Sequence, residues 1–171
     1  GRIVDKLARK ELLTNKSSIF NAPSRLVLEA TNYEEANKIN KNKGMGLSKQ
    51  SWNLVKKIKE VDDFIRNSNK TIIFESHPEI IFQVMKRDKV STKKKNDEGI
   101  IERRNLLEKN GFNKVFLERN LSAKDSFYKK DDFIDACSLF WSANRAIAKT
   151  EVKIPNDIVL DSEGIIMQIK V

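Results

Sequence analysis

A short apolar run that passes directly into a helix start is the feature that most restricts the fold. Residues 71–75, TIIFE, are β-branched and aromatic and too few for a helix, so they predict a buried strand. Directly afterwards, Ser76 and Glu79 have the spacing of a capping box and Pro78 suits a first turn, which predicts a helix to about residue 87. Functional groups of α/β proteins gather at such strand-to-helix corners. We therefore expect an α/β fold with its function at this corner.

The rest of the chain is mainly helical in pattern. Thr31 with Glu34 predicts one helix start and Ser48 predicts another. The short run 114–118 predicts either a second strand or the approach to a loop. Residues 151–171 predict a terminal hairpin or a strand extension, with a turn at 162–164. No repeat or boundary is visible, so we expect one domain over residues 1–171. Apolar spacing predicts helices over residues 3–13, 32–42, 48–65, 97–109 and 131–149.

Charge and cysteine content restrict the partners and the compartment. The 171 residues carry a formal charge of +9 with an isoelectric point near 9.6, which favours a polyanionic partner such as nucleic acid. The alternative is a lysine-rich surface that only keeps the protein soluble. Cys137 is the single cysteine, which excludes an internal disulfide and fits a reducing cytoplasmic compartment. No run has the length of a membrane span, and no signal peptide is visible.

A set of carboxylates is the main candidate for chemistry. Glu75 ends the predicted strand, and Asp132 and Asp135 are spaced i, i+3 on one face of the late helix. Carboxylates that converge from separate elements can hold Mg²⁺ or Mn²⁺, and such ions can activate water for attack on a phosphodiester. The alternative for the aspartates is compensation of the helix dipole.

Other side chains leave two interpretations open. His77, the only histidine, is either a general base or metal ligand or a packing residue of the corner, and Glu79 is most simply the capping partner of Ser76. Phosphate contacts are predicted for Arg25, Lys49 and Arg103, each of which is otherwise a solvated surface charge. The aromatic residues at 133, 140 and 141 are spaced for the buried face of a helix, which favours a core role over base stacking.

The order of these segments resembles one family. The segments DKLARKELLTNKSSIFNAPSR, YEEA, GLSKQSWNLVKKIKEVDDFI, FESHPEIIF, EGIIERRNLL, DDFIDACSLFWSA and IPNDIVLDSEGIIMQI are similar to successive signatures of the predicted RNase-H-like nucleases called domain of unknown function four-two-nine. The resemblance implies a three-layer RNase-H-like architecture, a mixed central sheet flanked by helices, with acidic residues proposed to bind divalent metal. In this sequence the Glu-x-x-Pro-Glu motif is Glu75, Pro78 and Glu79, and the Asp-Asp-x-x-Asp-Ala motif is Asp131, Asp132, Asp135 and Ala136.

The sequence also departs from that family. Family members have an N-terminal portion with a first strand bearing an aspartate, which the superfamily uses to bridge its metals, and nothing similar precedes residue 2 here. We expect the sequence to be a portion of a longer chain, so that the N-terminal strands of the sheet are absent from it. The other explanation is a shortened relative that has lost catalysis.

The expected function is metal-dependent hydrolysis of nucleic acid. Glu75, Asp132 and Asp135 are the expected catalytic metal ligands for Mg²⁺ or Mn²⁺, with Arg25, Lys49 or Arg103 on phosphate. One alternative is a basic nucleic-acid-binding module without catalysis, using the loops at 86–95 and 124–130. A second is a structural domain whose acidic residues only cap helices.

Overall fold

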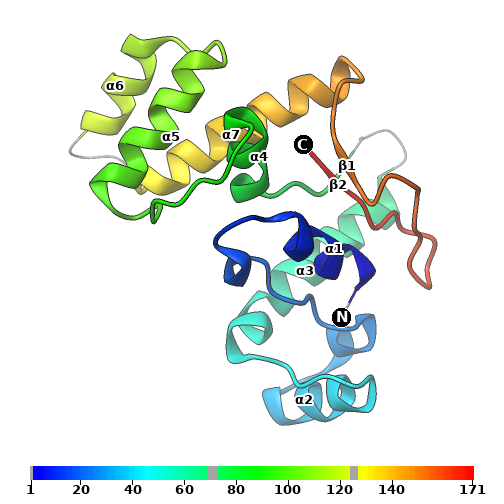
Figure 1. The fold of residues 1–171 in the computed structure, drawn as a ribbon. Coiled ribbons are helices and arrows are strands. Elements are labelled where there is room, and N and C mark those ends of the chain that lie inside the picture. Colours follow the sequence, from blue (N-terminus) through cyan, green and yellow to red (C-terminus); the bar gives the residue numbers. More distant parts are fainter. Residues whose placement is uncertain (1, 69–72, 124–126) are drawn as a thin grey trace.

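Helices account for most of the fold (Figure 1). The computed structural model of the protein describes residues 2–68, 73–123 and 127–171. In these residues the helices are α1 (Ile3–Glu11), α2 (Tyr33–Asn42), α3 (Lys49–Asn67), α4 (Pro78–Lys86), α5 (Asp97–Lys109), α6 (Lys114–Ser122) and α7 (Lys130–Ile147), with 3-10 turns η1 (Lys16–Ser18) and η2 (Arg25–Glu29) and strands β1 (Lys153–Ile154) and β2 (Ile169–Lys170).

The predicted RNase-H-like central sheet is wrong for the described residues. They contain one sheet of two antiparallel strands, in which Lys153 faces Lys170 and Ile154 faces Ile169. The predicted strand 71–75 contributes only a parallel bridge from Glu75 to Ile169, and its residues 71 and 72 lie outside the described part. A run this short makes a strand only where neighbours supply ladder hydrogen bonds, and its described part has one such bond to β2, from the Lys170 N–H to the Glu75 carbonyl at 2.9 Å.

The run 114–118 is also not a strand, because it lies in α6. Asn113 caps this helix, and its side-chain oxygen accepts a hydrogen bond from the Phe116 backbone N–H at 3.0 Å. Such a cap satisfies a backbone donor that a β-strand would direct to a neighbour. The local cap therefore outweighs the strand preference of Val115 and Phe116.

The other predicted helices are confirmed, with two corrections at their starts. Ser48 caps α3 as expected, accepting from Ser51 N at 3.0 Å. The capping position of α2 is Asn32 rather than Thr31. The capping box of α4 is wrong, because the helix begins after His77 and the Ser76 hydroxyl donates to the Lys170 carbonyl at 2.7 Å. Because the Ser76 hydroxyl is bonded to the end of β2, it does not cap α4.

The terminal hairpin is confirmed. A further antiparallel bridge joins Leu160 to Ile166, and Gly164 occupies the left-handed region at φ 79°. The Asp161 carboxylate accepts backbone hydrogen bonds from Glu163 and Ile165, both at 2.9 Å. Glycine and a carboxylate acceptor are the turn chemistry that the sequence indicated.

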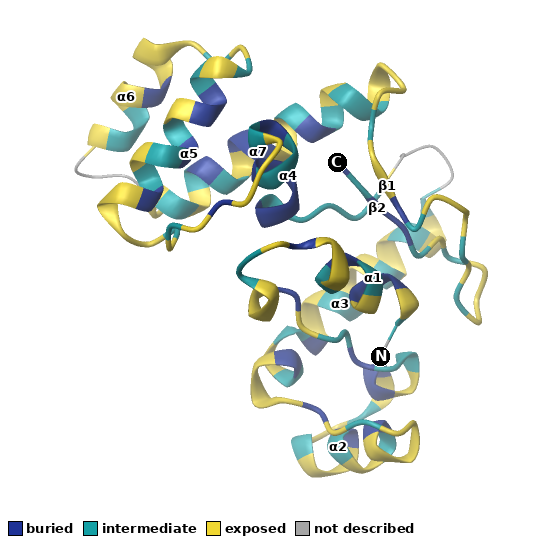
Figure 2. Ribbon diagram, in the orientation of Figure 1, coloured by how far each residue is buried: buried dark blue, intermediate teal, exposed yellow. Residues whose placement is uncertain are grey.

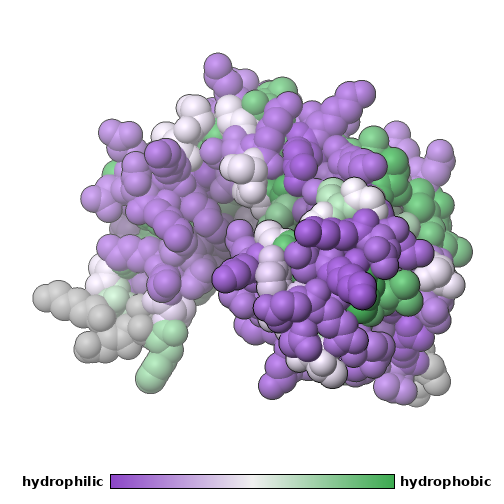
Figure 3. Space-filling model, turned by 90° about the horizontal axis from the view of Figure 1, so that it is seen from below, coloured by the Kyte–Doolittle hydropathy of each residue, from purple (hydrophilic) through white to green (hydrophobic). Residues whose placement is uncertain are grey.

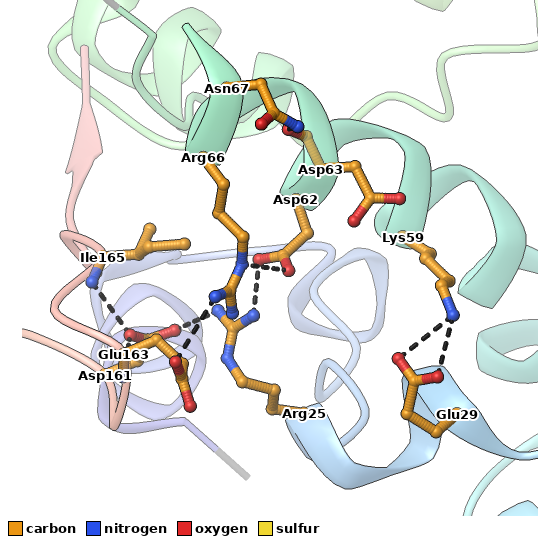
Figure 4. A network of polar contacts seen from close by, with 10 residues as sticks. All are labelled: Arg25, Glu29, Lys59, Asp62, Asp63, Arg66, Asn67, Asp161, Glu163 and Ile165. Atoms are coloured by element: carbon orange, nitrogen blue, oxygen red, sulfur yellow. Dashed lines mark hydrogen bonds and ion pairs between the residues drawn. The ribbon is translucent and has the colours of Figure 1, made fainter. Parts of the chain in front are cut away.

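An ion-pair network fastens this turn to α3 (Figure 4). Arg25 of η2 pairs with Asp62 of α3 and with Asp161 of the hairpin. Arg66 pairs with Asp62 at 2.9 Å and with Glu163 at 3.3 Å. Burial lowers the pKa of Arg25, but the hydrogen bonds and charges of Asp62 and Asp161 outweigh it and hold this pKa above its ordinary value. The network therefore connects segments far apart in sequence.

Two apolar clusters form the core (Figure 2). The smaller one joins η2, α2 and α3, and the larger one joins α1, α4, α5, α6, α7 and the C-terminus. Within the larger cluster α4 packs against both α5 and α7, and Ile80, Ile81 and Phe82 are buried. The start of α4 is consequently held at a junction of several segments. The larger cluster is Val4, Ala8, Leu12, Ile19, Ile80, Ile81, Phe82, Met85, Val90, Leu106, Leu107, Leu117, Ile134, Cys137, Ile154, Ile169 and Val171.

No helix among the described residues has the length and apolar composition needed to cross a bilayer.

Candidate functional site

A cleft of about 310 Å³ opens at the start of α4. In the view of Figure 3 the surface is hollowed between the part formed by α5 and α6 and the part formed by the N-terminal segments. Four segments meet here: residues 15–18, the first turn of α4, the loop 91–96 and the second turn of α7. The residues that line this α4 cleft are Asn15, Ser17, Ser18, His77, Pro78, Glu79, Lys93, Lys94 and Asp135.

A buried ion pair supports the floor of the cleft. Arg103 of α5 is 0% exposed and donates to both Glu79 carboxylate oxygens, at 3.0 and 2.9 Å. Its other bonds go to the Gly99 carbonyl at 3.1 Å and to the carbonyl and the hydroxyl of Thr92, each at 3.3 Å. Asn15 completes the group by donating to Glu79 at 3.2 Å. One guanidinium thus joins α4, α5 and the loop that carries the lysines.

Close backbone packing holds the same loop in place. Gly99 lies so near that a Cβ at this position would collide with the carbonyl of Lys93. Val90 is buried, and its carbonyl accepts a hydrogen bond from Thr14 at 2.6 Å. The backbone of this polar loop is thus in contact with neighbouring segments at Val90 and at Lys93. The loop backbone that carries Lys93 and Lys94 is therefore held by contacts with α5 and with the segment after α1.

Asp135 and Lys94 form the ion pair of the cleft wall. Lys94 Nζ lies 2.6 Å from Asp135 Oδ2, whereas Oδ1 is buried without a hydrogen-bond partner. Burial raises the pKa of Asp135, and Lys94 offsets this only in part. Burial lowers the pKa of Lys94, but the hydrogen bond and charge of Asp135 outweigh it, so the net direction is upward. The Asp135 carboxylate thus has one buried oxygen that makes no hydrogen bond.

The imidazole of His77 also lines the α4 cleft. Burial lowers its pKa, although the Ser18 carbonyl and the charges of Glu79 and Asp135 act in the opposite direction. Its Nε2 lies 3.5 Å from the Ser18 carbonyl oxygen, and Nδ1 is buried without a partner. A neutral imidazole can accept a proton or a hydrogen bond near neutral pH.

The three predicted metal ligands have different surroundings. Glu75 is paired with Arg2 at 2.5 and 2.8 Å, Asp135 lines the α4 cleft, and Asp132 is exposed without an ion pair among the described residues. Within that part of the chain no three histidine, cysteine or acidic side chains are grouped so that they could hold a metal ion. The residues present therefore do not fit the divalent metal that the family resemblance implies, and the ligand set stays a prediction.

The predicted phosphate-binding cations divide in the same way. The prediction that Arg103 contacts phosphate is corrected, because the side chain is buried and its hydrogen bonds are made within the protein. Arg25 is used by the network that fastens the hairpin. Lys49 is exposed, with its ammonium 6.0 Å from the centre of the Tyr33 ring. Only Lys49 retains an exposed charge for a ligand.

Lys93, Lys94 and Asn15 were missed as individual site residues. A signal for the lysines existed: residues 86–95 contain six basic residues and one aspartate, which the alternative of a binding module had singled out. Residues 124–126 of the other loop named there lie outside the described part. Nothing in the local sequence indicated that Asn15 would reach α4.

Comparison with known proteins gives a family and no activity. No curated protein matches the chain, and no solved structure matches it. The family described as "Protein of unknown function (DUF429)" matches residues 1–158. With nearly its whole length matched, the chain belongs to this family of unknown function.

Proposed function

We propose that this protein binds the phosphodiester backbone of nucleic acid at the α4 cleft and the adjoining basic loop, residues 86–95. The observation that carries the proposal is the fixed placement of Lys93 and Lys94 beside the first turn of α4 in one cleft. The overall charge of +9 supports the same class of partner.

The chemistry of the cleft suits a phosphate oxygen. The start of α4 presents the positive end of the helix dipole. Pro78 has no N–H, and the N–H groups of Ile80 and Ile81 donate to the His77 carbonyl at 3.0 Å, so the dipole and the side chains rather than a row of backbone donors would attract the phosphate. Lys93 forms no ion pair among the described residues, and Lys94 still has donors beyond its single bond to Asp135. Ser17 and Ser18 add hydroxyl groups, which bind phosphate irrespective of base sequence.

Salt dependence of binding tests the proposal. We would measure fluorescence anisotropy of labelled single- and double-stranded DNA and RNA between low and physiological salt. Lys93→Gln/Lys94→Gln should weaken binding and reduce the slope of log K against log salt by about 1.8 on duplex DNA, because each lost phosphate contact removes about 0.9. An unchanged slope, or no binding of any oligonucleotide, would overturn the proposal.

A matched control separates the cleft from general surface charge. Lys56 and Lys57 of α3 are exposed neighbours outside the cleft. Lys56→Gln/Lys57→Gln lowers the net charge equally, and it should leave the slope near its original value. An equal effect of both double variants would mean that net charge alone attracts the nucleic acid.

Hydrolysis at the same cleft is our second candidate. It is favoured by Asp135 Oδ1 and His77 Nδ1, two buried atoms without hydrogen-bond partners on residues that line one cleft. We would incubate the same oligonucleotides with the protein, in buffer with a chelator and in buffer with a divalent cation, and follow cleavage on denaturing gels. Asp135→Asn should abolish cleavage, and Asp63→Asn, at an exposed residue of α3 outside the cleft, should not. An intact substrate under every condition would leave binding as the function.

A further inference from the structure

Aromatic side chains gather where α6 meets the start of α7. Phe116 of α6 and Tyr128 each contact Phe133 of α7, with ring centres 5.7 and 5.6 Å apart. The Tyr128 ring is stacked on Phe133, and its hydroxyl donates to the Asn120 side chain at 3.0 Å. Phe127 is fully exposed next to Tyr128, and Phe116 is 47% exposed. We call Phe116, Phe127, Tyr128 and Phe133 the aromatic patch.

The core role expected for residues 133, 140 and 141 is corrected in part. Phe133 and Trp141 are half-buried and pack against the larger apolar cluster. Phe140 is 63% exposed, and its ring meets Phe112 edge-on at 6.1 Å. Phe133 therefore anchors the aromatic patch on the core, while the ring of Phe127 stays open to solvent.

Cations border the aromatic patch. Arg119 follows Phe116 by three residues on α6, which is the spacing of neighbours on one helix face. Lys129 and Lys130 precede Phe133 by four and three residues at the start of α7. All three cations are exposed, and within residues 2–68, 73–123 and 127–171 none of them forms an ion pair.

Three carboxylates lie near these cations: Glu118, Asp131 and Asp132. Glu118 is already in ion pairs with Lys114 and Arg104, at 3.8 and 3.9 Å. Asp131 and Asp132 precede Asp135 and Ala136 by four residues, so they lie on rows of α7 other than the row of Phe133. The cations without ion pairs outnumber these two aspartates, and the border of the patch is basic.

Resting on the proposed function, we propose that the aromatic patch stacks unpaired bases of the nucleic acid whose backbone binds at the α4 cleft, so that the protein prefers single strands. Every base has a π-face, and only unpaired bases expose it to a side chain. Exposed rings interleaved with cations suit such a strand, whereas an apolar protein partner would bury the cations without counter-charges.

The patch and the cleft share one end of α7. Asp135 lies 2.6 Å from Lys94 in the cleft and follows Lys129 by six residues, which is about 9 Å along the helix axis. Lys129 and Lys130 therefore lie between the phosphate contacts of the cleft and the rings of the patch. One strand can reach both by crossing the start of α7.

Fluorescence anisotropy with single-stranded and blunt duplex oligonucleotides tests the proposal. Phe127→Ala should weaken single-strand binding about 5- to 150-fold, the loss of one base stack, and leave duplex binding unchanged. The slope of log K against log salt should stay the same, because no phosphate contact is lost. Phe127→Trp should retain the affinity. Phe64→Ala is the matched control, because Phe64 is 55% exposed but lies on α3, and it should change nothing.

An abasic single strand separates base stacking from backbone binding. It carries the same phosphates without bases, so it should bind the unmodified protein and Phe127→Ala equally. Binding that depends on Lys93 and Lys94 but is indifferent to Phe127→Ala would overturn the stacking proposal alone. So would an equal loss for the abasic strand or for the duplex. No binding of any oligonucleotide would overturn the proposed function, and the stacking proposal with it.

Discussion

Replacing Glu79 with Gln tests the buried ion pair beneath the α4 cleft. The two side chains have the same shape, so the change removes the negative charge and leaves the cavity filled. Arg103 then keeps its positive charge at 0% exposure, with the Gly99 carbonyl and the carbonyl and hydroxyl of Thr92 as remaining acceptors. A buried charge without its partner is strongly unfavourable.

The structure sets the size of the effect. Breaking a buried ion pair by removing one partner costs about 3–5 kcal/mol. Arg103 retains its carbonyl acceptors, and the Gln side-chain oxygen replaces one bond, so we expect the lower end, about 3 kcal/mol. For a chain of 171 residues this corresponds to a fall in Tm of about 6–12 °C.

Urea unfolding followed by circular dichroism measures this loss. The transition midpoint should fall while the m-value is kept, since the surface exposed on unfolding is the same. Glu118→Gln is the control, because Glu118 lies 3.9 Å from Arg104 in an exposed pair and should lose less than about 0.5 kcal/mol. A loss below about 1 kcal/mol for Glu79→Gln would refute the argument that Arg103 is sealed from water.

Three further outcomes follow from individual side chains. Burial lowers the pKa of His77, which lies among Glu79, Asp135 and Lys94, so the unfolded chain binds more protons than the folded one below about pH 6.5. The free energy of unfolding should therefore fall between pH 7 and pH 5, and it should fall less in His77→Gln. Urea unfolding at each pH measures both. Gly99→Ala collides with the Lys93 carbonyl and should cost about 1–3 kcal/mol and weaken oligonucleotide binding, whereas Gly46→Ala, with only an ordinary 3.7 Å contact, should not. Burial raises the pKa of the Cys137 thiol to about 11, so its reaction with a disulfide reagent should be slow until urea is added; equal rates would contradict this.

Local patterns predicted the helices well because each helix closes its own hydrogen bonds. The cap at Ser48, the Pro78 start and the terminal hairpin with Gly164 all depend on residues within a few positions of one another. The extent of the sheet was overestimated because strands, unlike helices, do not close their own hydrogen bonds. A strand such as 71–75 depends on partners elsewhere in the chain, and apolar β-branched residues do not specify whether those partners are present.

The candidate site required tertiary structure for similar reasons. The motif around His77 indicated the corner, and the run 86–95 indicated a basic loop, but neither indicated that they would meet. Contacts between distant residues decided the rest: Glu79 was predicted as a cap and instead pairs with Arg103, 24 positions away.

The sequence by itself determined the helical segments, the final turn, the basic character and the family. Only the tertiary structure decided which charges face solvent and which are consumed inside the protein. Arg103 and Lys94 have the same sign of charge, yet one is sealed against Glu79 while the other lines a cleft. The physical reason is that a side chain's role depends on desolvation and on partners brought together by folding, and neither is encoded in the residues beside it.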